Sequence, residues 1–251
     1  MVSRVAGLGS RDDFVLDARA IDVAHVLNQP DSHTGSVRGS MGEVRAWGAR
    51  QGYAVAKRTV DLVFASTVLA VFLPVWLVVA AMVLGTSPGS VLFRQPRCGR
   101  GGRPFTCLKF RTMVANAEAI LRVDASLREA FAKNWKLSED PRVTQVGRWL
   151  RKTSLDEIPQ LLNVLRGDMS LVGPRPVQLD ELRDHYGHAA ATVLSVTPGL
   201  TGLWQVSGRS NLTYEDRVAL DLEYVRRRGF WFDLAIILRT IPALVLGHGA
   251  V

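Results

Sequence analysis

One block of the chain is far more apolar than the rest. From Leu62 to Leu84 the sequence runs for 23 residues without a charge. A helix of that length matches the thickness of a bilayer, whereas a helix in the core of a soluble domain, the alternative, does not require so long an uncharged segment. The pattern therefore predicts that residues 52–86 enter a membrane as a helix.

Two features of this segment favour a helix that dips into the membrane and returns to the same face. Lys57 and Arg58 precede the block, and Arg94 and Arg97 are among the arginines that follow it, so positive charge marks both flanks as cytosolic. Pro74 lies near the middle, where its missing N–H breaks or kinks a helix. The alternative is an ordinary span kinked at Pro74, because neighbouring groups can satisfy the freed carbonyl in a membrane helix.

Downstream of Gly89 the pattern changes to that of a soluble domain. Residues 91–98 and 104–112 are two extended segments separated by a glycine-rich turn, which is typical of a β-hairpin. Between residues 167 and 211 the chain is rich in Gly and Pro, so little helix is expected there. Helix is expected over four stretches, residues 114–134, 153–166, 177–190 and 213–228.

The last stretch, residues 231–246, is apolar and amphipathic. Its charges Asp233 and Arg239 would be costly in hydrocarbon, which favours a helix at the membrane interface over a span. Together the elements predict an α+β fold, in which a membrane re-entrant helix hairpin precedes a small, mostly helical cytosolic domain with a β-hairpin and interfacial amphipathic helices. The expected units are residues 1–51, a polar and mobile extension, residues 52–86, the membrane helix, and residues 87–251, the domain that follows.

The formal net charge of +8 and the isoelectric point near 10.1 favour anionic partners. Nucleic acid, an acidic membrane surface and phosphorylated substrates all meet that requirement. The sequence has no recognised nucleic-acid motif and no basic stripe interleaved with aromatic residues, so we expect no nucleic-acid partner. The only two cysteines, Cys98 and Cys107, imply no disulfide framework and agree with a reduced, cytosol-facing domain.

The densest chemical signal is the adjacent pair Asp156 and Glu157 in the segment Thr153–Gln160. One interpretation is structural, because Ser154 and Glu157 have the spacing of a capping box at a helix N-terminus. The other is catalytic, because two neighbouring carboxylates close to many arginines can bind a divalent cation and attack or position a phosphorus atom. The spacing of these residues leaves both interpretations open.

Several cations have the chemistry of phosphate ligands. Arg175 lies in the glycine and proline loop 167–176, and Arg209 ends a second such loop, 197–209, which also contains Trp204. A guanidinium on a restricted backbone suits bidentate contact with phosphate oxygens, although a structural salt bridge is the alternative for each arginine. Trp204 could stack on a base or pack in the core. The end of the hairpin adds two more cations, Lys109 and Arg111.

At this point a resemblance is clear. The segments FRQPRCGRGGRPFTCLKFRTM, DPRVTQVGRWLRKTSLDEIPQLLNVLRGDMSLVGPRP and TPGLTGLWQVSGR, in this order, are similar to the bacterial sugar transferase family, the monotopic polyprenol phosphate phosphoglycosyl transferases. The similarity runs from about Ala56 to Leu246. It implies that residues 87–251 form the catalytic domain, and it also implies a re-entrant helix broken near a proline.

The resemblance assigns different roles to the two acids. Asp156 corresponds to the nucleophile that takes up the phosphosugar, and Glu157 to a residue that helps to hold Mg²⁺. It further implies phosphate or nucleotide contacts for four cations, Lys109, Arg111, Arg175 and Arg209.

The implied reaction is ping-pong transfer of a sugar-1-phosphate from a UDP-sugar to a polyprenol phosphate of the undecaprenyl type. UMP is released, and the product begins the assembly of a polysaccharide or glycoconjugate. The resemblance places the enzyme in the inner membrane with its catalytic domain facing the cytoplasm, and suggests polysaccharide-assembly proteins as partners. No residue discriminates one sugar from another.

Two alternatives stay open at this stage. A non-catalytic scaffold would use the membrane helix and the basic surface to bind acidic lipid or an assembly partner, and it predicts that Asp156 is dispensable. A transferase that works without a covalent intermediate would form no phosphosugar adduct on Asp156.

Overall fold

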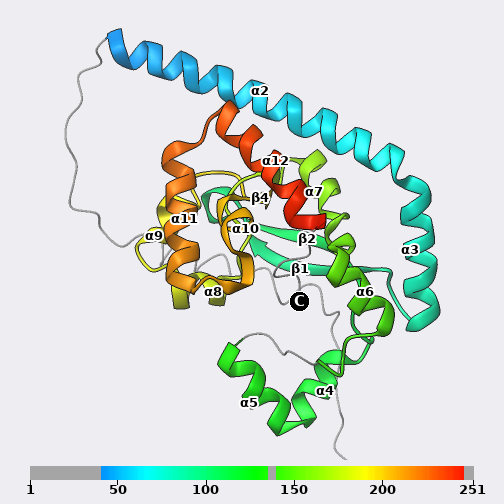
Figure 1. The fold of residues 1–251 in the computed structure, drawn as a ribbon. Coiled ribbons are helices and arrows are strands. Elements are labelled where there is room, and N and C mark those ends of the chain that lie inside the picture. The colour runs from blue at the N-terminus through cyan, green and yellow to red at the C-terminus, as the bar shows by residue number, and fades with distance from the viewer. Residues whose placement is uncertain (1–40, 135–139, 246–251) are drawn as a thin grey trace, which may run out of the picture.

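The computed structural model describes residues 41–134 and 140–245, which form a mostly helical α+β fold (Figure 1). The first described element is the long helix α2 (Met41–Val71), which extends along one side of the domain. The polar extension predicted for residues 1–51 therefore ends in helix. Residues 1–40 of that extension lie outside the described residues.

Helix α2 bends into α3 (Leu73–Thr86) at the single residue Phe72, and the two axes differ by 64°. Pro74 lies in the first turn of α3, where its missing N–H would have no helical partner in any case. In the described part of the chain no single helix has the length and apolar character to cross a bilayer, but this bent pair does by length and composition. The helix break predicted at Pro74 is thus located at its N-terminal side.

The bent pair exposes an unusual amount of apolar surface. Helix α3 is exposed along most of its length, and only Val79 and Val83 are buried, against Phe110 and Leu150. Helix α12 (Phe230–Val245) packs along α2 and adds exposed apolar side chains of its own. Exposed apolar surface of this extent marks a membrane or protein contact. The exposed apolar side chains on α2, α3 and α12 include Val63, Phe64, Val71, Leu73, Leu77, Val78, Leu84, Trp231, Leu238 and Ile241.

The predicted β-hairpin is present. Strands β1 (Leu92–Cys98) and β2 (Pro104–Phe110) are antiparallel and are joined by a turn that contains the 3-10 helix η1 (Arg100–Gly102). Gly101 has a φ of 67°, in the left-handed region that glycine adopts without strain. In this register Cys98 faces Pro104 and Gln95 faces Cys107, so the two buried thiols are not paired, as the sequence indicated.

A second, parallel sheet was not expected from the sequence. It consists of β3 (Ser170–Val172) and β4 (Gly199–Thr201), which lie in the two glycine and proline loops. A Cβ atom added to Gly199 would lie 2.1 Å from the backbone nitrogen of Gly173, so the loops cross too closely for any side chain. The crossing joins two segments that the sequence treated as separate.

The helices agree with the sequence in part. The helix predicted over 153–166 is divided by a 3-10 turn, and the helix that precedes this turn was not predicted. The final two helices, by contrast, lie within a few residues of their predicted bounds. The remaining elements are α4 (Ala117–Val123), α5 (Ala125–Asn134), α6 (Gln145–Thr153), η2 (Leu155–Glu157), α7 (Gln160–Arg166), α8 (Leu179–His185), α9 (Ala189–Val193), α10 (Leu203–Ser207), η3 (Arg209–Asn211) and α11 (Tyr214–Arg227).

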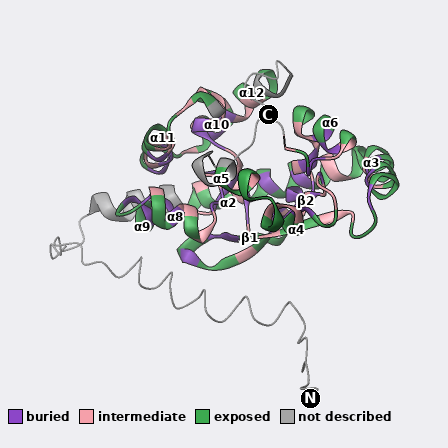
Figure 2. Ribbon diagram, turned by 90° about the horizontal axis from the view of Figure 1, so that it is seen from below, coloured by how far each residue is buried: buried purple, intermediate pink, exposed green. Residues whose placement is uncertain are grey.

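The largest core cluster joins α2 to the domain. Ala65 of α2 packs with Leu161 and Val164 of α7, with Leu171 of β3 and with Ile236 of α12. Figure 2 shows buried positions along the hairpin and on α11, whereas α3 is mostly exposed. Helix α2 is therefore part of the same core as the domain that it precedes.

Polar contacts fasten α2 as well. Arg58 donates hydrogen bonds to the carbonyl oxygens of Val164 and Leu165 at 2.6 and 2.9 Å, in the last turn of α7, where a cation also complements the helix dipole. Lys57 and Arg58, first noted as charges flanking the membrane block, therefore also bind the domain directly.

Candidate active site

Asp156 and Glu157 lie in η2, between α6 and α7. The chain enters η2 through Ser154, which adopts a left-handed conformation with a φ of 57° and forms the C-cap of α6. The Ser154 side chain makes no capping hydrogen bond, and α7 does not begin until Gln160. The capping-box interpretation of Ser154 and Glu157 is therefore wrong, because tertiary contacts determine where the two carboxylates lie.

Glu157 is held by a lysine from the hairpin. Its Oε1 lies 2.6 Å from Nζ of Lys109, near the end of β2. Burial alone would raise the pKa of Glu157, but the positive charges of Lys109 and Arg175 outweigh it and hold the pKa below its usual value. Glu157 is thus an anion in a positively charged setting.

Asp156 has the opposite environment. The residue is buried, with 9% of its surface exposed. Burial and the neighbouring charge of Glu157 raise its pKa to about 6, and the charges of Lys109 and Arg151 offset only part of this rise. A carboxylate with a raised pKa is still mostly ionised at neutral pH, and it is more basic than an exposed aspartate.

A cleft of about 360 Å³, measured with its open mouth, lies beside this pair. It is formed by the hairpin, by η2 with the start of α7, and by the two crossing loops. Its lining carries three cations and a carboxylate, so it has the chemistry of a binding site for an anionic ligand. The lining residues are Arg97, Cys107, Lys109, Glu157, Gln160, Arg175, Pro176, Gly199, Leu200 and Gln205.

The structure brings together only some of the predicted site residues. Lys109, Glu157 and Arg175 line one cleft. Asp156 is buried and precedes Glu157 in the chain, but it is not itself a lining residue. Arg209 does not line the cleft, but its Nε donates to the carbonyl oxygen of Gln205, a lining residue, at 3.2 Å.

Arg111 lies apart from this group. Its guanidinium donates to the backbone carbonyl oxygens of Ser87 and Pro88, where α3 returns to the hairpin. In this structure Arg111 fastens that junction and does not reach the cleft lining.

Arg175 is directed by the crossing of the two small strands. The Gly173 amide donates to the Thr201 carbonyl at 2.9 Å, and the Gly199 amide donates to the Pro174 carbonyl at 2.7 Å, so the backbone before Arg175 is fixed on β4. The Arg175 guanidinium lies 5.6 Å from the ring centroid of Trp204, within the range of a cation–π contact. Trp204 is buried, so of its two interpretations, base stacking and packing, the structure favours packing.

The sequence analysis did not assign Arg97, which lines the cleft, or Asn163, which lies behind it, to the site. Arg97 was noted only as a flanking charge, yet it is 8% exposed, lines the cleft and donates to the Pro176 carbonyl at 3.1 Å. Burial and the charge of Arg175 lower the pKa of Arg97, while Glu181 counteracts this. Strand β1 does not alternate between buried and exposed residues, so its pattern gave no signal for Arg97.

Asn163 is the second missed residue and is fully buried in α7. Its Oδ1 accepts a hydrogen bond from the Leu108 amide at 3.0 Å, and its Nδ2 donates to the Thr106 carbonyl at 2.8 Å. These bonds fix β2 against α7, and therefore set the place of Lys109 relative to Glu157. A buried Asn within an apolar helical segment is the signal that could have identified it.

The sequence of this domain matches a known family model. The model described as bacterial sugar transferase covers residues 52–247. The chain belongs to the bacterial sugar transferase family. The resemblance inferred from the motifs is thus confirmed, and the cleft is the candidate active site of a transferase.

Curated relatives support the same assignment. The exopolysaccharide production protein ExoY of Rhizobium meliloti is 47% identical over 200 residues, which cover 78% of this chain and 88% of that protein. The UDP-glucose:undecaprenyl-phosphate glucose-1-phosphate transferase of Caulobacter vibrioides is 43% identical, over 77% of this chain and 71% of that protein. The UDP-galactose-lipid carrier transferase of Erwinia amylovora is 46% identical over 77% of this chain but only 41% of its own length.

The carboxylates of this sugar transferase fit an Mg²⁺ ion that has few protein ligands and is held mainly by substrate phosphates and water. Among the residues that the structure describes, no three His, Cys, Asp or Glu side chains gather as a metal cage. Mg²⁺ is usually held by one or two carboxylates, with waters and substrate phosphates completing its coordination. Glu157 lies on the cleft wall with 34% of its side chain exposed, which suits such a site, and its carboxylate is paired with Lys109 here.

Proposed function

We propose that this sugar transferase moves a sugar-1-phosphate from a UDP-sugar to a polyprenol phosphate of the undecaprenyl type, through a covalent phosphosugar on Asp156. The observation that carries the proposal is the buried, weakly acidic Asp156 beside a cleft with three cations. The names of the relatives supply the substrates, because they include a UDP-glucose:undecaprenyl-phosphate glucose-1-phosphate transferase and an undecaprenyl-phosphate galactose phosphotransferase.

In the first half-reaction a carboxylate oxygen of Asp156 attacks the β-phosphorus of the UDP-sugar. A bond forms between that oxygen and phosphorus, and the bond from phosphorus to the bridging oxygen breaks, so UMP leaves with the electron pair. Burial supports this role, because a poorly solvated carboxylate is more basic than one in water. Lys109 and Arg175 are placed to neutralise charge on the phosphate oxygens as it shifts toward the leaving group.

In the second half-reaction an oxygen of the polyprenol phosphate attacks the phosphorus held on Asp156. The bond from phosphorus to the Asp156 oxygen breaks, which restores the carboxylate and releases a polyprenyl diphosphate sugar. Splitting the transfer in two allows the nucleotide and the lipid to use the same cations in turn. The product would begin the assembly of an exopolysaccharide, the process named for two of the relatives.

Mg²⁺ is the cofactor that we propose for this site, with Glu157 as its protein ligand. When bound, it would neutralise charge on the diphosphate of the nucleotide. Lys109 has two functions in this scheme, because it keeps Glu157 ionised and can turn to phosphate when the carboxylate is engaged elsewhere. Arg97 donates a hydrogen bond to the carbonyl of Pro176, the residue after Arg175, and so helps to fix the backbone there.

We further propose that α2 and α3 form a re-entrant hairpin in the inner membrane, with the catalytic domain of residues 87–251 in the cytoplasm. The 64° bend, the exposed apolar surface of α3 and the contacts of Lys57 and Arg58 with the domain support this topology. The arrangement would hold the cleft close to a surface where a lipid phosphate is present. Single-cysteine variants at Gly52 and Ser90 test it, because labelling from opposite sides of sealed vesicles would contradict a re-entrant helix.

The reaction is tested with detergent-solubilised protein, Mg²⁺ and a panel of labelled UDP-sugars, with and without polyprenol phosphate. We expect UMP release and a labelled protein adduct without the lipid, and transfer of the label when the lipid is added. Asp156→Asn should abolish both, because a carboxamide is not a nucleophile toward phosphorus. Normal transfer by Asp156→Asn would contradict the covalent mechanism, and the absence of transfer by the unaltered protein with every UDP-sugar would favour the scaffold alternative.

A further inference from the structure

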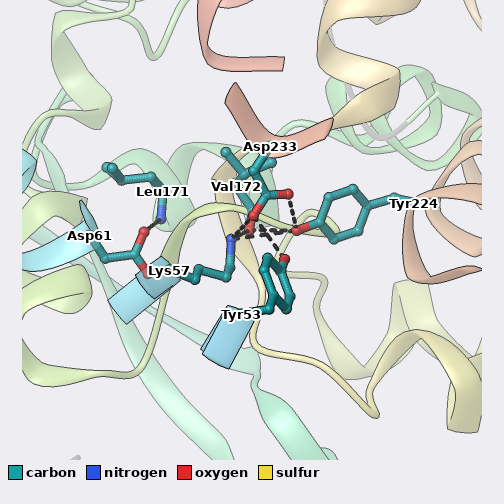
Figure 3. A network of polar contacts seen from close by, with 7 residues as sticks. All are labelled: Tyr53, Lys57, Asp61, Leu171, Val172, Tyr224 and Asp233. Carbon is teal, nitrogen blue, oxygen red and sulfur yellow. Dashed lines mark hydrogen bonds and ion pairs between the residues drawn. The ribbon is translucent and has the colours of Figure 1, made fainter. Parts of the chain in front are cut away.

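Three polar side chains of α2 lie on one face of the helix and point into the domain. Tyr53, Lys57 and Asp61 are spaced four residues apart, which places them one above another along a helix. Ala65, four residues further, continues the same face into the apolar core. Figure 3 shows the three polar side chains directed at β3 and α12. The helix thus directs a polar stripe into the protein just before its uncharged segment begins at Leu62.

The stripe satisfies the backbone of β3. Asp61 Oδ1 accepts a hydrogen bond from the Leu171 amide at 2.9 Å, and Lys57 Nζ donates to the Val172 carbonyl at 2.8 Å (Figure 3). Strand β3 pairs with β4, and Leu171 and Val172 are 4% and 1% exposed. A buried backbone amide without a partner is costly, so Asp61 and Lys57 serve β3 as a neighbouring strand would.

A network fixes Lys57 in turn. Its Nζ lies 2.6 Å from Asp233 Oδ2, and that same oxygen accepts a hydrogen bond from the Tyr53 hydroxyl at 2.9 Å. The Tyr224 hydroxyl lies 2.9 Å from Asp233 Oδ1 and 3.1 Å from the Val172 carbonyl (Figure 3). Lys57 of α2 and Tyr224 of α11 therefore meet at the Val172 carbonyl, the last of β3, and Asp233 of α12 links the two side chains.

Beyond that carbonyl the chain has little freedom before it reaches the cleft. Gly173 and Pro174 are buried, and each forms a backbone hydrogen bond with β4. The next residue is Arg175. The ring of Pro174 fixes one of the two backbone dihedral angles of that proline. A displacement of Val172 is thus carried to Arg175 without a flexible segment to absorb it.

We propose that Asp61 and Lys57 are positioning residues for Arg175, through which the membrane-type helix α2 sets the catalytic cleft. The inference rests on the proposed function, in which Arg175 contacts the phosphates of the substrate. It assigns to α2 a task beyond anchoring, because the same face that docks the helix also fixes the strand that presents the arginine. Asp61 gives the clearer test of the two, because the Leu171 amide donates to its Oδ1, whereas Lys57 and the Tyr224 hydroxyl both lie within hydrogen-bond distance of the Val172 carbonyl.

The test is a double-mutant cycle on kcat/KM for the UDP-sugar. The variants are Asp61→Ala, Arg175→Ala and their combination, with Asp61→Asn as the conservative change that keeps an acceptor oxygen. Thr59→Ala is the matched control, because Thr59 is exposed on the same helix and its hydroxyl donates to the Val55 carbonyl one turn earlier. Lys57→Met completes the series.

We expect Asp61→Ala to lower kcat/KM by about 10- to 100-fold, because a misplacement of about 1 Å in a group that binds the transition state has that effect. Asp61→Asn should recover most of the loss. Lys57→Met should also lower kcat/KM, because it removes a donor to the Val172 carbonyl and the cation beside Asp233. In the Arg175→Ala background, Asp61→Ala should change kcat/KM by less than about twofold, since residues acting through one group are not additive. Full additivity, or an equal loss in Asp61→Ala and Asp61→Asn, would overturn the inference.

Amide hydrogen exchange supplies a readout that does not depend on activity. In Asp61→Ala the peptide that contains residues 170–175 should exchange faster, while peptides from α8 and α11 should not change. Uniformly faster exchange would indicate a general loss of stability and would overturn the inference, as would unchanged exchange over 170–175. If the unaltered protein transfers no sugar, the proposed function fails, and this exchange pattern still decides whether Asp61 holds the strand.

Discussion

Lys109 and Glu157, 48 positions apart in sequence, meet with Nζ 2.6 Å from Oε1 at the wall of the cleft. The surroundings of the two adjacent carboxylates move their pKa values in opposite directions. Lys109 and Arg175 hold the pKa of Glu157 below its usual value, while burial raises the pKa of Asp156 to about 6. Environments that move neighbouring pKa values apart are typical of carboxylates with separate catalytic tasks. The geometry thus agrees with a nucleophile at Asp156 and a charge-bearing ligand at Glu157.

Lys109→Met is expected to lower kcat/KM for the UDP-sugar by roughly 100-fold, the usual effect of losing one charge-stabilising group at a reacting centre. The change keeps the apolar stem and removes only the ammonium group. The measurement is initial-rate UMP release with increasing UDP-sugar. Lys152→Met, an exposed lysine on α6, is the control and should match the unaltered protein. A loss of less than threefold in Lys109→Met would contradict a catalytic role for its charge.

The pH dependence of the first half-reaction should report Asp156. Only the ionised carboxylate is a nucleophile, so the rate should be constant well above pH 6 and fall about tenfold per pH unit below it. Single-turnover UMP release without polyprenol phosphate is the proper measurement, because a phosphate monoester also titrates near pH 6.

In Lys109→Met the acid limb of this profile should move to higher pH, since the charge of Lys109 lowers the pKa of Asp156. A limb that does not move, or that lies near pH 4, would show that another group is titrating.

The motifs named Lys109, Glu157 and Arg175, which line one cleft in the structure, and Asp156 next to Glu157. They did not predict how these segments come together. The β3–β4 crossing was missed because three-residue strands in glycine and proline loops have no periodicity to detect. The tie between α2 and the domain was missed for another reason.

Lys57 was interpreted through charge topology alone, and Asp61 lies just before the apolar block, where a lone acid has no distinctive pattern. Their roles depend on a strand 110 or more residues away, and contacts at that separation are determined by packing. Arg111 shows the converse: its motif suggested a phosphate contact, yet the backbone carbonyls of Ser87 and Pro88 bind its guanidinium.

Gly199→Ala should disrupt the crossing that directs Arg175. The added Cβ would lie 2.1 Å from the Gly173 nitrogen and 2.5 Å from the Thr201 oxygen, which no backbone can accommodate without moving. We expect the apparent melting temperature to fall by roughly 5–10 °C and transfer activity to fall with it.

Gly52→Ala is the control for this change, because that glycine is exposed in helix α2 with open space around it. There alanine should stabilise slightly, by up to about 1 kcal/mol. An unchanged melting temperature in Gly199→Ala would show that the two loops do not cross as described.

Asn163→Ala should loosen the packing of β2, which carries Lys109, against α7, which follows Glu157 in the chain. The change removes the acceptor of the Leu108 amide and the donor to the Thr106 carbonyl, and the Leu108 amide has no water to replace its partner because that residue is 5% exposed. The expected cost is roughly 2–3 kcal/mol in the free energy of unfolding, measured as a lower melting temperature in detergent.

Asn116→Ala, an exposed asparagine whose side chain makes no cap bond, should change neither stability nor activity. Because Asn163 places β2 on α7, the surviving folded Asn163→Ala protein should also show a weaker Lys109 effect. Adding Lys109→Met to it should lower kcat/KM less than in the unaltered background. Equal losses in both backgrounds would mean that Asn163 stabilises the fold without positioning Lys109 over Glu157.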